Sequence, residues 1–142
     1  MLVDANLLLY AVDRGSPLHA SARDWWQGCL NGSRRVALPW PTVLAFVRIS
    51  THPRASARPL TAEQAWRYVA EWLAQPVVWT PVETERHADV LGELLLRYGI
   101  RGNLVTDAHL VALALCHGLS IASADTDFAR FTDVTWINPL SP

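Results

Sequence analysis

The chain has 142 residues, of which 51% are hydrophobic and 18% charged, and this balance excludes a disordered protein. The length suits a single domain over residues 1–142 with one core. A formal charge of −1 argues against binding nucleic acid mainly by neutralising phosphates, but it allows binding through a metal ion.

The sequence contains no sign of membrane insertion or export. No apolar run approaches the ~18 residues that a membrane-spanning helix needs. The N-terminus lacks the basic and cleavage regions of a signal peptide, so we expect a cytoplasmic protein. Cys29 and Cys116 lie far apart without a CxxC pattern, which favours reduced, structural cysteines over a zinc site.

Hydrophobic periodicity and turn signals predict short strands alternating with helices along the chain. The expected strands cover residues 2–4, 35–38, 77–79, 120–122 and 134–136. The expected helices cover residues 6–12, 19–30, 42–50, 61 to the stop at Pro76, 83–98 and 104–117, with a helical turn or two over 126–131. Alternation of this kind predicts an α/β fold with three layers, α/β/α, around a short, mainly parallel sheet of four to five strands.

Several residues are typical of helix ends. Gly32 is expected to end the second helix, and Asn103 to cap the helix over 104–117. Thr61 and Gln64 have the spacing of a capping box. Four tryptophans recur at helical positions, where core packing is the expected role and a partner groove the alternative: Trp25, Trp26, Trp66 and Trp72.

Four aspartates stand where burial is expected. Asp4 ends the first strand, Asp107 lies in the first turn of the most apolar helix, and Asp125 and Asp127 directly follow the strand over 120–122. Each alone has a structural explanation, as a helix cap, a turn residue or an acid favoured by the helix dipole. Asp4 is therefore either a cap or one wall of a site.

Together the acids indicate a metal site. The carboxyl ends of parallel strands, and the helices that follow them, meet at one edge of a sheet, so these carboxylates should converge. Their mutual repulsion would raise their pKa values unless a cation lay among them. Oxygen ligands select a hard ion such as Mg²⁺ or Mn²⁺, which suits metal-assisted hydrolysis of a phosphodiester.

The sequence resembles the PIN-domain ribonucleases, and specifically the VapC toxins of bacterial type II toxin–antitoxin systems. The resemblance runs nearly end to end and rests on six motifs in order: VDANLLLY at 3–10, LPW at 38–40, LAFVR at 44–48, THPR at 51–54, GNLVTDAHL at 102–110 and SADTDF at 123–128.

The resemblance implies a PIN fold, metal-dependent endoribonuclease activity with Mg²⁺ or Mn²⁺, an RNA substrate, a cognate antitoxin and a homodimer. It implies Asp4, Asp107 and Asp125 as catalytic acids that bind the metal, with Asp127 as a further member. It also implies that Asn6 holds the first acid by hydrogen bonding, and that Thr106 and Ser123 are supporting polar groups.

One position departs from the family pattern. Many members have a glutamate in the helix after the second strand, at the position where this chain has Ala45, three residues before Arg48. The metal would then have fewer protein ligands and more water, another acid would substitute, or activity would be lower. Asp13 is a substitute by proximity alone, and a turn residue is its commoner role.

The basic residues have two interpretations. Arg48, Arg54 and Arg58 either lie in solvent around a core helix and its loop, or they form a phosphate-contacting rim around the acids. His52 either stacks on or hydrogen-bonds RNA or, as is commoner for a lone histidine in a loop, does neither. His109 lies roughly 200° around its helix from Asp107, so it should face away from the metal.

Two other classes of protein fit parts of the pattern. Phosphotransfer modules also place an aspartate at a strand end, but they use a lysine near the phosphoryl group, and all 12 basic residues here are arginine. A phosphatase of the haloacid-dehalogenase type also needs a second acid where this chain has Asn6. A catalytically impaired PIN-fold protein that binds RNA or antitoxin is the alternative that Ala45 leaves open.

Overall fold

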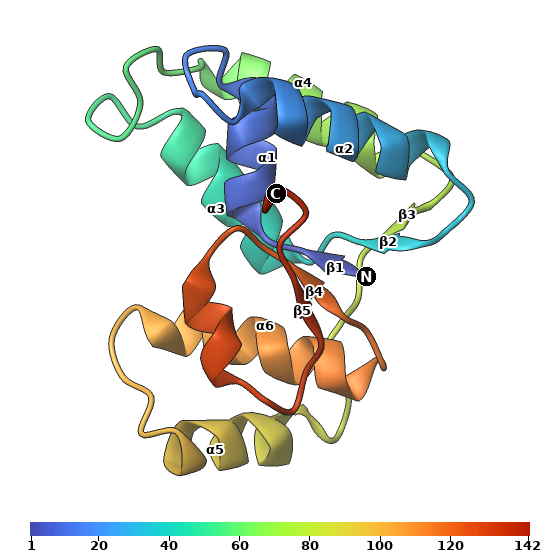
Figure 1. Cartoon of the computed structure of the whole chain (residues 1–142), viewed down its shortest axis with the longest axis vertical. Coiled ribbons are helices and arrows are strands. Elements are labelled where there is room, and N and C mark those ends of the chain that lie inside the picture. Colours follow the sequence, from blue (N-terminus) through green and yellow to red (C-terminus); the bar gives the residue numbers. More distant parts are fainter.

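Five short parallel strands form the centre of the computed structural model, which describes residues 1–142 (Figure 1). The strands are β1 (Leu2–Val3), β2 (Val36–Ala37), β3 (Val78–Trp79), β4 (Ile121–Ala122) and β5 (Trp136–Ile137). The helices are α1 (Ala5–Val12), α2 (His19–Asn31), α3 (Trp40–Ser50), α4 (Ala62–Leu73), α5 (His87–Arg97) and α6 (Leu104–Cys116), with a 3₁₀ helix η1 (Thr126–Arg130).

The strand order β3-β2-β1-β4-β5 places β1 at the centre of the sheet. All pairs are parallel, and Leu2 of β1 is in register with Ala37 on one side and Ile121 on the other. The chain builds outward from β1 to β3 and then returns to continue from β4 on the opposite side. The gap between the ends of β1 and β4 is therefore the topological switch point, where open α/β sheets bind ligands.

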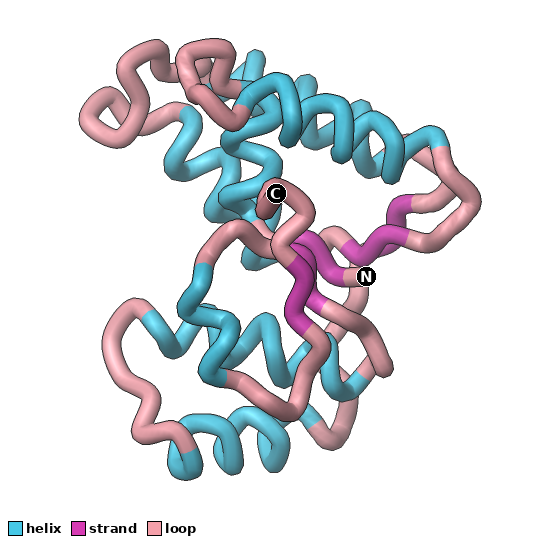
Figure 2. The backbone as a smooth tube through the Cα atoms, viewed as in Figure 1, coloured by secondary structure: helices cyan, strands magenta, loops and turns pink.

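Helices cover both faces of the sheet, as Figure 2 shows with the strands in magenta between helices in cyan. Val3 points into a core shared with α1 to α4, which contains Leu7, Trp26 and Phe46. Leu2 points into the opposite core, which contains α5, α6 and η1. The two residues of such a short strand thus face opposite sides of the sheet, and each packs into a different core. This explains why every strand residue of β1, β2 and β4 is apolar and buried.

The predicted three-layer α/β/α fold with a parallel sheet is confirmed, and the element order is as expected. Most boundaries differ by one or two residues. The fifth strand is Trp136–Ile137 rather than 134–136, because Val134 is buried in the core beside α6. The helix expected from residue 83 begins at His87, after an irregular segment.

The cap predictions had mixed outcomes. Thr61 and Gln64 form both hydrogen bonds of the capping box, and Gly32 is the C-cap of α2. Asn103 precedes α6 in a helical conformation and its side chain makes no capping bond, so that prediction was wrong. The expectation of core packing holds for Trp26 and Trp72 but is wrong for Trp66, which is exposed on α4.

No helix of the structure combines the length and apolar character that a membrane crossing requires.

Candidate functional site

Asp4 stands at the carboxyl end of β1 and is the N-cap of α1. One carboxylate oxygen, Oδ1, accepts the backbone N–H of Ala5 at 2.7 Å. The other, Oδ2, accepts the Ser123 hydroxyl at 2.7 Å and the Asn6 amide at 3.0 Å. Asp4 is thus a cap, and it is also fixed from the neighbouring strand.

Ser123 is the link between the two strand ends. It is fully buried directly after β4, and its hydroxyl oxygen accepts the Asn6 amide at 2.9 Å and the backbone N–H of Asp125 at 3.0 Å. The Asn6 side-chain oxygen in turn accepts the backbone N–H of Ala124 at 3.2 Å. This network ties α1 to the segment after β4 and sets the position of both aspartates at the switch point.

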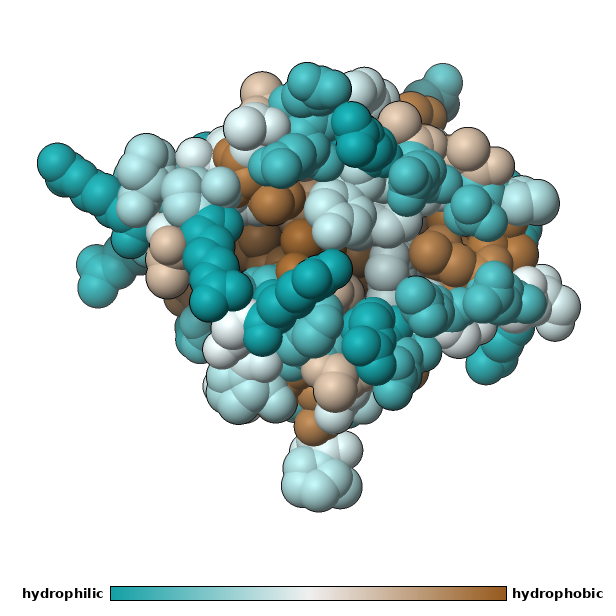
Figure 3. Space-filling model, turned by 90° about the horizontal axis from the view of Figure 1, so that it is seen from above, coloured by the Kyte–Doolittle hydropathy of each residue, from teal (hydrophilic) through white to brown (hydrophobic).

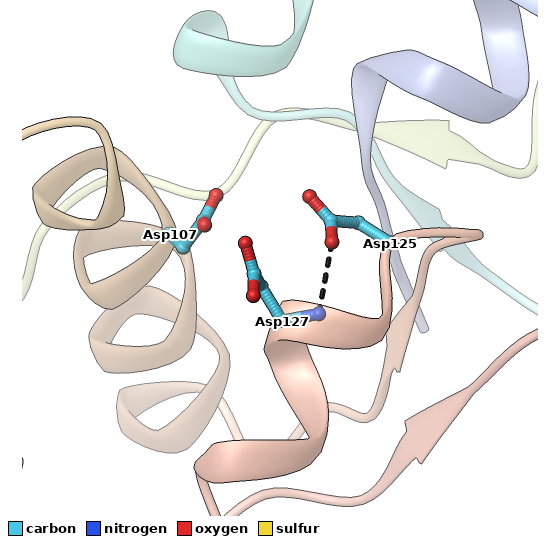
Figure 4. A group of neighbouring side chains, drawn as sticks. All are labelled: Asp107, Asp125 and Asp127. Carbon is cyan, nitrogen blue, oxygen red and sulfur yellow. Dashed lines mark hydrogen bonds between the residues drawn. The ribbon is translucent and has the colours of Figure 1, made fainter.

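Three carboxylates converge beside this network (Figure 4). Each of Asp107, Asp125 and Asp127 offers an oxygen, and these oxygens all lie within 4.8 Å of one another. Asp107 projects from the first turn of α6, and Asp125 and Asp127 come from the start of η1. The Asp127 backbone N–H donates to Asp125 Oδ1 at 2.8 Å, which fixes the two η1 acids relative to each other.

Asp4 lies outside that group of three, but it interacts with the group electrostatically. Burial is the main cause that raises the pKa of Asp4, and the charge of Asp125 adds to the rise. The hydrogen bonds from Ser123 and Ala5 act in the opposite direction and lower it. The four acids therefore form one cluster of coupled charges, with three of them close enough to share a single cation.

Asp107 has the most perturbed carboxyl group of the cluster. Burial comes first among the causes that raise the pKa of Asp107 from 3.8 to about 6, followed by the charges of Asp4, Asp125 and Asp127. A carboxyl group in this environment gains from any cation that neutralises its neighbours. The negative charge of the four acids is thus not balanced by the positive side chains at the site.

Arg130 is the one cation that acts on this cluster, and sequence reasoning missed it. Its guanidinium donates to Asp127 Oδ1 at 3.0 Å and to the Asp127 backbone oxygen at 3.1 Å, and its charge lowers the pKa of Asp107. The i, i+3 spacing of Asp127 and Arg130 on an expected helical turn was the available signal.

The remaining predicted residues are not brought into the acidic cluster. Thr106 is exposed next to Asp107. Arg48 is exposed on α3 and Arg54 is exposed in the following loop, and neither pairs with an acid. Asp13 is the C-cap of α1 and accepts the backbone N–H of Gly15, at the end of the helix opposite to Asp4, so it does not fill the position left by Ala45.

His109 faces away from the acids, as the sequence predicts. Its Nδ1 lies 3.0 Å from Nε2 of the buried His87 of α5, and its Nε2 lies 3.5 Å from Glu83. Burial, followed by the His87 ring, lowers the pKa of His109. This contact joins α5 to α6 and belongs to the packing on the side of the sheet that α5, α6 and η1 cover.

The donor set at the switch point fits a hard divalent cation. All its candidate ligands are carboxylate oxygens, three of them lie within 4.8 Å, and no sulfur or imidazole takes part. The half-buried position leaves one side open to solvent, as a substrate phosphate requires. An ion held here would reduce the repulsion that raises the pKa of Asp107.

Comparison with protein families gives a match that covers most of the chain. The PIN domain model matches residues 1–134. Ribonuclease VapC37 of Mycobacterium tuberculosis is 47% identical over 138 residues, which is 97% of this chain and 96% of that protein. Ribonuclease VapC33 of the same species is 44% identical over 140 residues, 99% of this chain and 98% of that protein.

Solved structures agree in fold at low sequence identity. VapC20 of Mycobacterium tuberculosis, a toxin that cleaves the sarcin–ricin loop, has a TM-score of 0.68 at 19% identity and covers 94% of this chain and 98% of its own. VapBC-1 of nontypeable Haemophilus influenzae has a TM-score of 0.69 at 19% identity, covering 99% and 98%. With an all-parallel sheet in the order β3-β2-β1-β4-β5 and full-length relatives at up to 47% identity, the chain belongs to the PIN-domain family and, within it, to the VapC ribonucleases.

Proposed function

We propose that this protein is the toxin of a type II toxin–antitoxin pair and a Mg²⁺- or Mn²⁺-dependent endoribonuclease that hydrolyses RNA phosphodiester bonds. The observation that carries the proposal is the convergence of Asp107, Asp125 and Asp127 at the switch point of a fold whose relatives are named ribonucleases. The proposal does not require a large, positively charged RNA-binding groove, because a cation bound among the acids can contact the phosphate.

The ligands of the proposed ion are Asp107, Asp125 and Asp127, with Asp4 adjacent to them. When bound, such an ion lowers the pKa of a water molecule and polarises a phosphoryl oxygen. The ion Mg²⁺ keeps several waters and binds through few carboxylates, which is compatible with three protein oxygens and no glutamate at Ala45.

The protein's own residues position the acids. Ser123 and Asn6 donate to Asp4 and keep its carboxylate turned toward the strand ends. Asp125 and Asp107 are the acids proposed to orient the attacking water, because both lie at the cluster. Arg130 is held on Asp127, and its charge offsets part of the negative charge of the cluster.

Arg48 and Arg54 are proposed to contact RNA farther from the acids. Both are exposed and carry no ion pair, so their guanidinium groups are free for phosphate oxygens. Because neither side chain contacts an acid of the cluster, their loss should weaken RNA binding more than it slows cleavage of bound RNA.

An antitoxin partner is proposed from the structural neighbours. Two of them, VapBC2 from Rickettsia felis and FitAB, are toxin–antitoxin complexes bound to DNA. Figure 3 looks onto the α1–α4 face of this chain and shows apolar residues in hollows between hydrophilic ridges. One hollow, of about 370 Å³, lies among α1, α3 and the segment before α4, with Leu9, Phe46 and Tyr68 in its lining and Arg14 and Arg58 at its polar side.

That hollow would accept apolar side chains of a partner segment. A homodimer and a cytoplasmic location are likewise expected for such a toxin. The lack of a glutamate at position 45, where this chain has Ala45, supports a second candidate function. This is a catalytically impaired PIN-fold protein that binds RNA or its antitoxin without cleaving RNA.

The deciding experiment is cleavage of total RNA by the purified full chain with Mg²⁺, with Mn²⁺ and with EDTA, followed by mapping of the new ends. Asp4→Asn and Asp107→Asn should abolish cleavage, while Asp89→Asn, an exposed first-turn acid of α5, should retain it. Equal behaviour of wild type and all three variants would exclude cleavage by this site and favour the binding protein. Expression without an antitoxin should arrest growth, and harmless expression at high level would contradict the toxin assignment.

A further inference from the structure

Trp40 is a large aromatic side chain that the fold leaves in solvent. It is 46% exposed, whereas Trp26 and Trp72 are almost completely buried. No aromatic ring, arginine or hydrogen-bond acceptor in the structure pairs with it, although Trp26, Trp72 and Trp79 all have ring or cation partners. Tryptophan is usually well buried, so an exposed, unpartnered indole has no role in the core.

The place of Trp40 in the fold puts its backbone at the same edge of the sheet as Asp4. It is the first residue of α3, two residues beyond Leu38, which follows β2. Since β2 pairs with β1 in parallel, the carboxyl ends of both strands lie at one edge. The Thr42 hydroxyl donates to the Val3 backbone oxygen at 2.8 Å, which holds the first turn of α3 against the residue before Asp4.

The backbone around Trp40 is rigid. It lies between Pro39, which is buried, and Pro41, which occupies the first turn of α3. Proline fixes its own φ and restricts the residue before it, so the indole is carried on a segment with little freedom. A rigid aromatic loses little conformational entropy when a flat ligand packs on it.

The charge of the protein explains why such a contact matters. A ribonuclease with a formal charge of −1 gains little affinity from general attraction to phosphates. At the acids, Arg130 is engaged by Asp127. Binding of single-stranded nucleic acid by stacking depends on π-faces rather than on net charge, and each stacked base contributes about 1–3 kcal/mol.

We propose that Trp40 is a stacking platform for an unpaired base of single-stranded RNA adjacent to the phosphodiester at the acids. The inference rests on the proposed endoribonuclease function and adds a residue outside the acidic cluster that positions the RNA. Leu44 and Arg48 follow at i+4 and i+8 on the same exposed side of α3. An RNA strand stacked on Trp40 would therefore pass over Leu44 toward the guanidinium of Arg48.

The test is RNA binding without cleavage. Fluorescence anisotropy in EDTA measures the affinity of the full chain for a labelled single-stranded RNA oligonucleotide and for the same oligonucleotide in a duplex. Trp40→Ala should weaken binding of the single strand about tenfold or more. Trp40→Phe keeps an aromatic face and should stay within about threefold of wild type. Trp66→Ala removes an equally exposed indole, 50% accessible on α4, and should leave binding unchanged.

Several results would overturn the inference. Single-strand binding by Trp40→Ala equal to that of wild type is one, and an equal loss for the duplex is another, because a base paired inside a helix offers no free face. A third is a loss of binding accompanied by a fall in solution mass by light scattering, which would make Trp40 part of an interface between copies. Absence of metal-dependent cleavage by wild type would contradict the proposed function instead, and it is read in a separate assay.

Discussion

Replacing Asp107 by asparagine should stabilise the folded protein at neutral pH while removing metal binding. Burial and three neighbouring acids raise the pKa of Asp107 from 3.8 to about 6, so the folded state disfavours the charged form. The unfolded chain has no such environment, and its Asp107 ionises near the ordinary value. Above pH 6 the charged carboxylate therefore costs free energy on folding, and asparagine avoids that cost.

The size of the effect follows from the pKa. A rise from 3.8 to about 6 is worth about 3 kcal/mol, at about 1.4 kcal/mol per pKa unit. Asp107 is only half-buried, and solvent screening reduces the expected gain to about 1–2 kcal/mol. The sign depends on pH: the penalty is complete above pH 6, decreases as the pH falls through the folded pKa, and disappears below about pH 4, where both states are protonated.

Urea unfolding followed by tryptophan fluorescence in EDTA measures this gain at pH 7.5 and at pH 4. The matched control is Asp89→Asn, which removes a first-turn acid from α5 and so corrects for loss of the helix-dipole interaction, about 0.3–1 kcal/mol. Added Mg²⁺ or Mn²⁺ should stabilise wild type and leave Asp107→Asn unchanged. If Asp107→Asn is less stable than Asp89→Asn at pH 7.5, the electrostatic reasoning is refuted.

Three further changes test the surroundings of the cluster. Ser123→Ala removes a hydrogen bond to Asp4 and should weaken Mn²⁺ binding about 10–100-fold by calorimetry, and unchanged affinity would exclude a positioning role. Arg130→Gln removes the cation that lowers the pKa of Asp107, so NMR titration of that carboxyl should give a higher pKa than in wild type; a lower one would contradict the pairing. Phe128→Ala empties a fully buried position in η1 and should cost about 3–5 kcal/mol in urea unfolding, whereas a loss below about 1 kcal/mol would show that η1 is not anchored there.

The sequence by itself determined the alternation of elements and the identity of the acids. Periodicity is a local property: α6 is apolar nearly all round because it is buried nearly all round, and that is visible in residues 104–117 alone. Asp4 and Asp125 could be placed at one edge because parallel strands end together. The motifs of the PIN family added the expected metal and RNA chemistry, and the family assignment is confirmed by the relatives.

Only the tertiary structure decided which of those residues meet. Ser123 bonds Asp4 across 119 residues of sequence, and no local pattern contains that contact. It depends on the register of β1 with β4. The packing of α6 and η1 in one core brings oxygens of Asp107, Asp125 and Asp127 within 4.8 Å of one another. Helical spacing predicted a buried Trp66, but exposure depends on which face the neighbouring helices cover, and α4 turns that side to solvent. Distances between elements set the charge coupling, and those distances exist only once the sheet has formed.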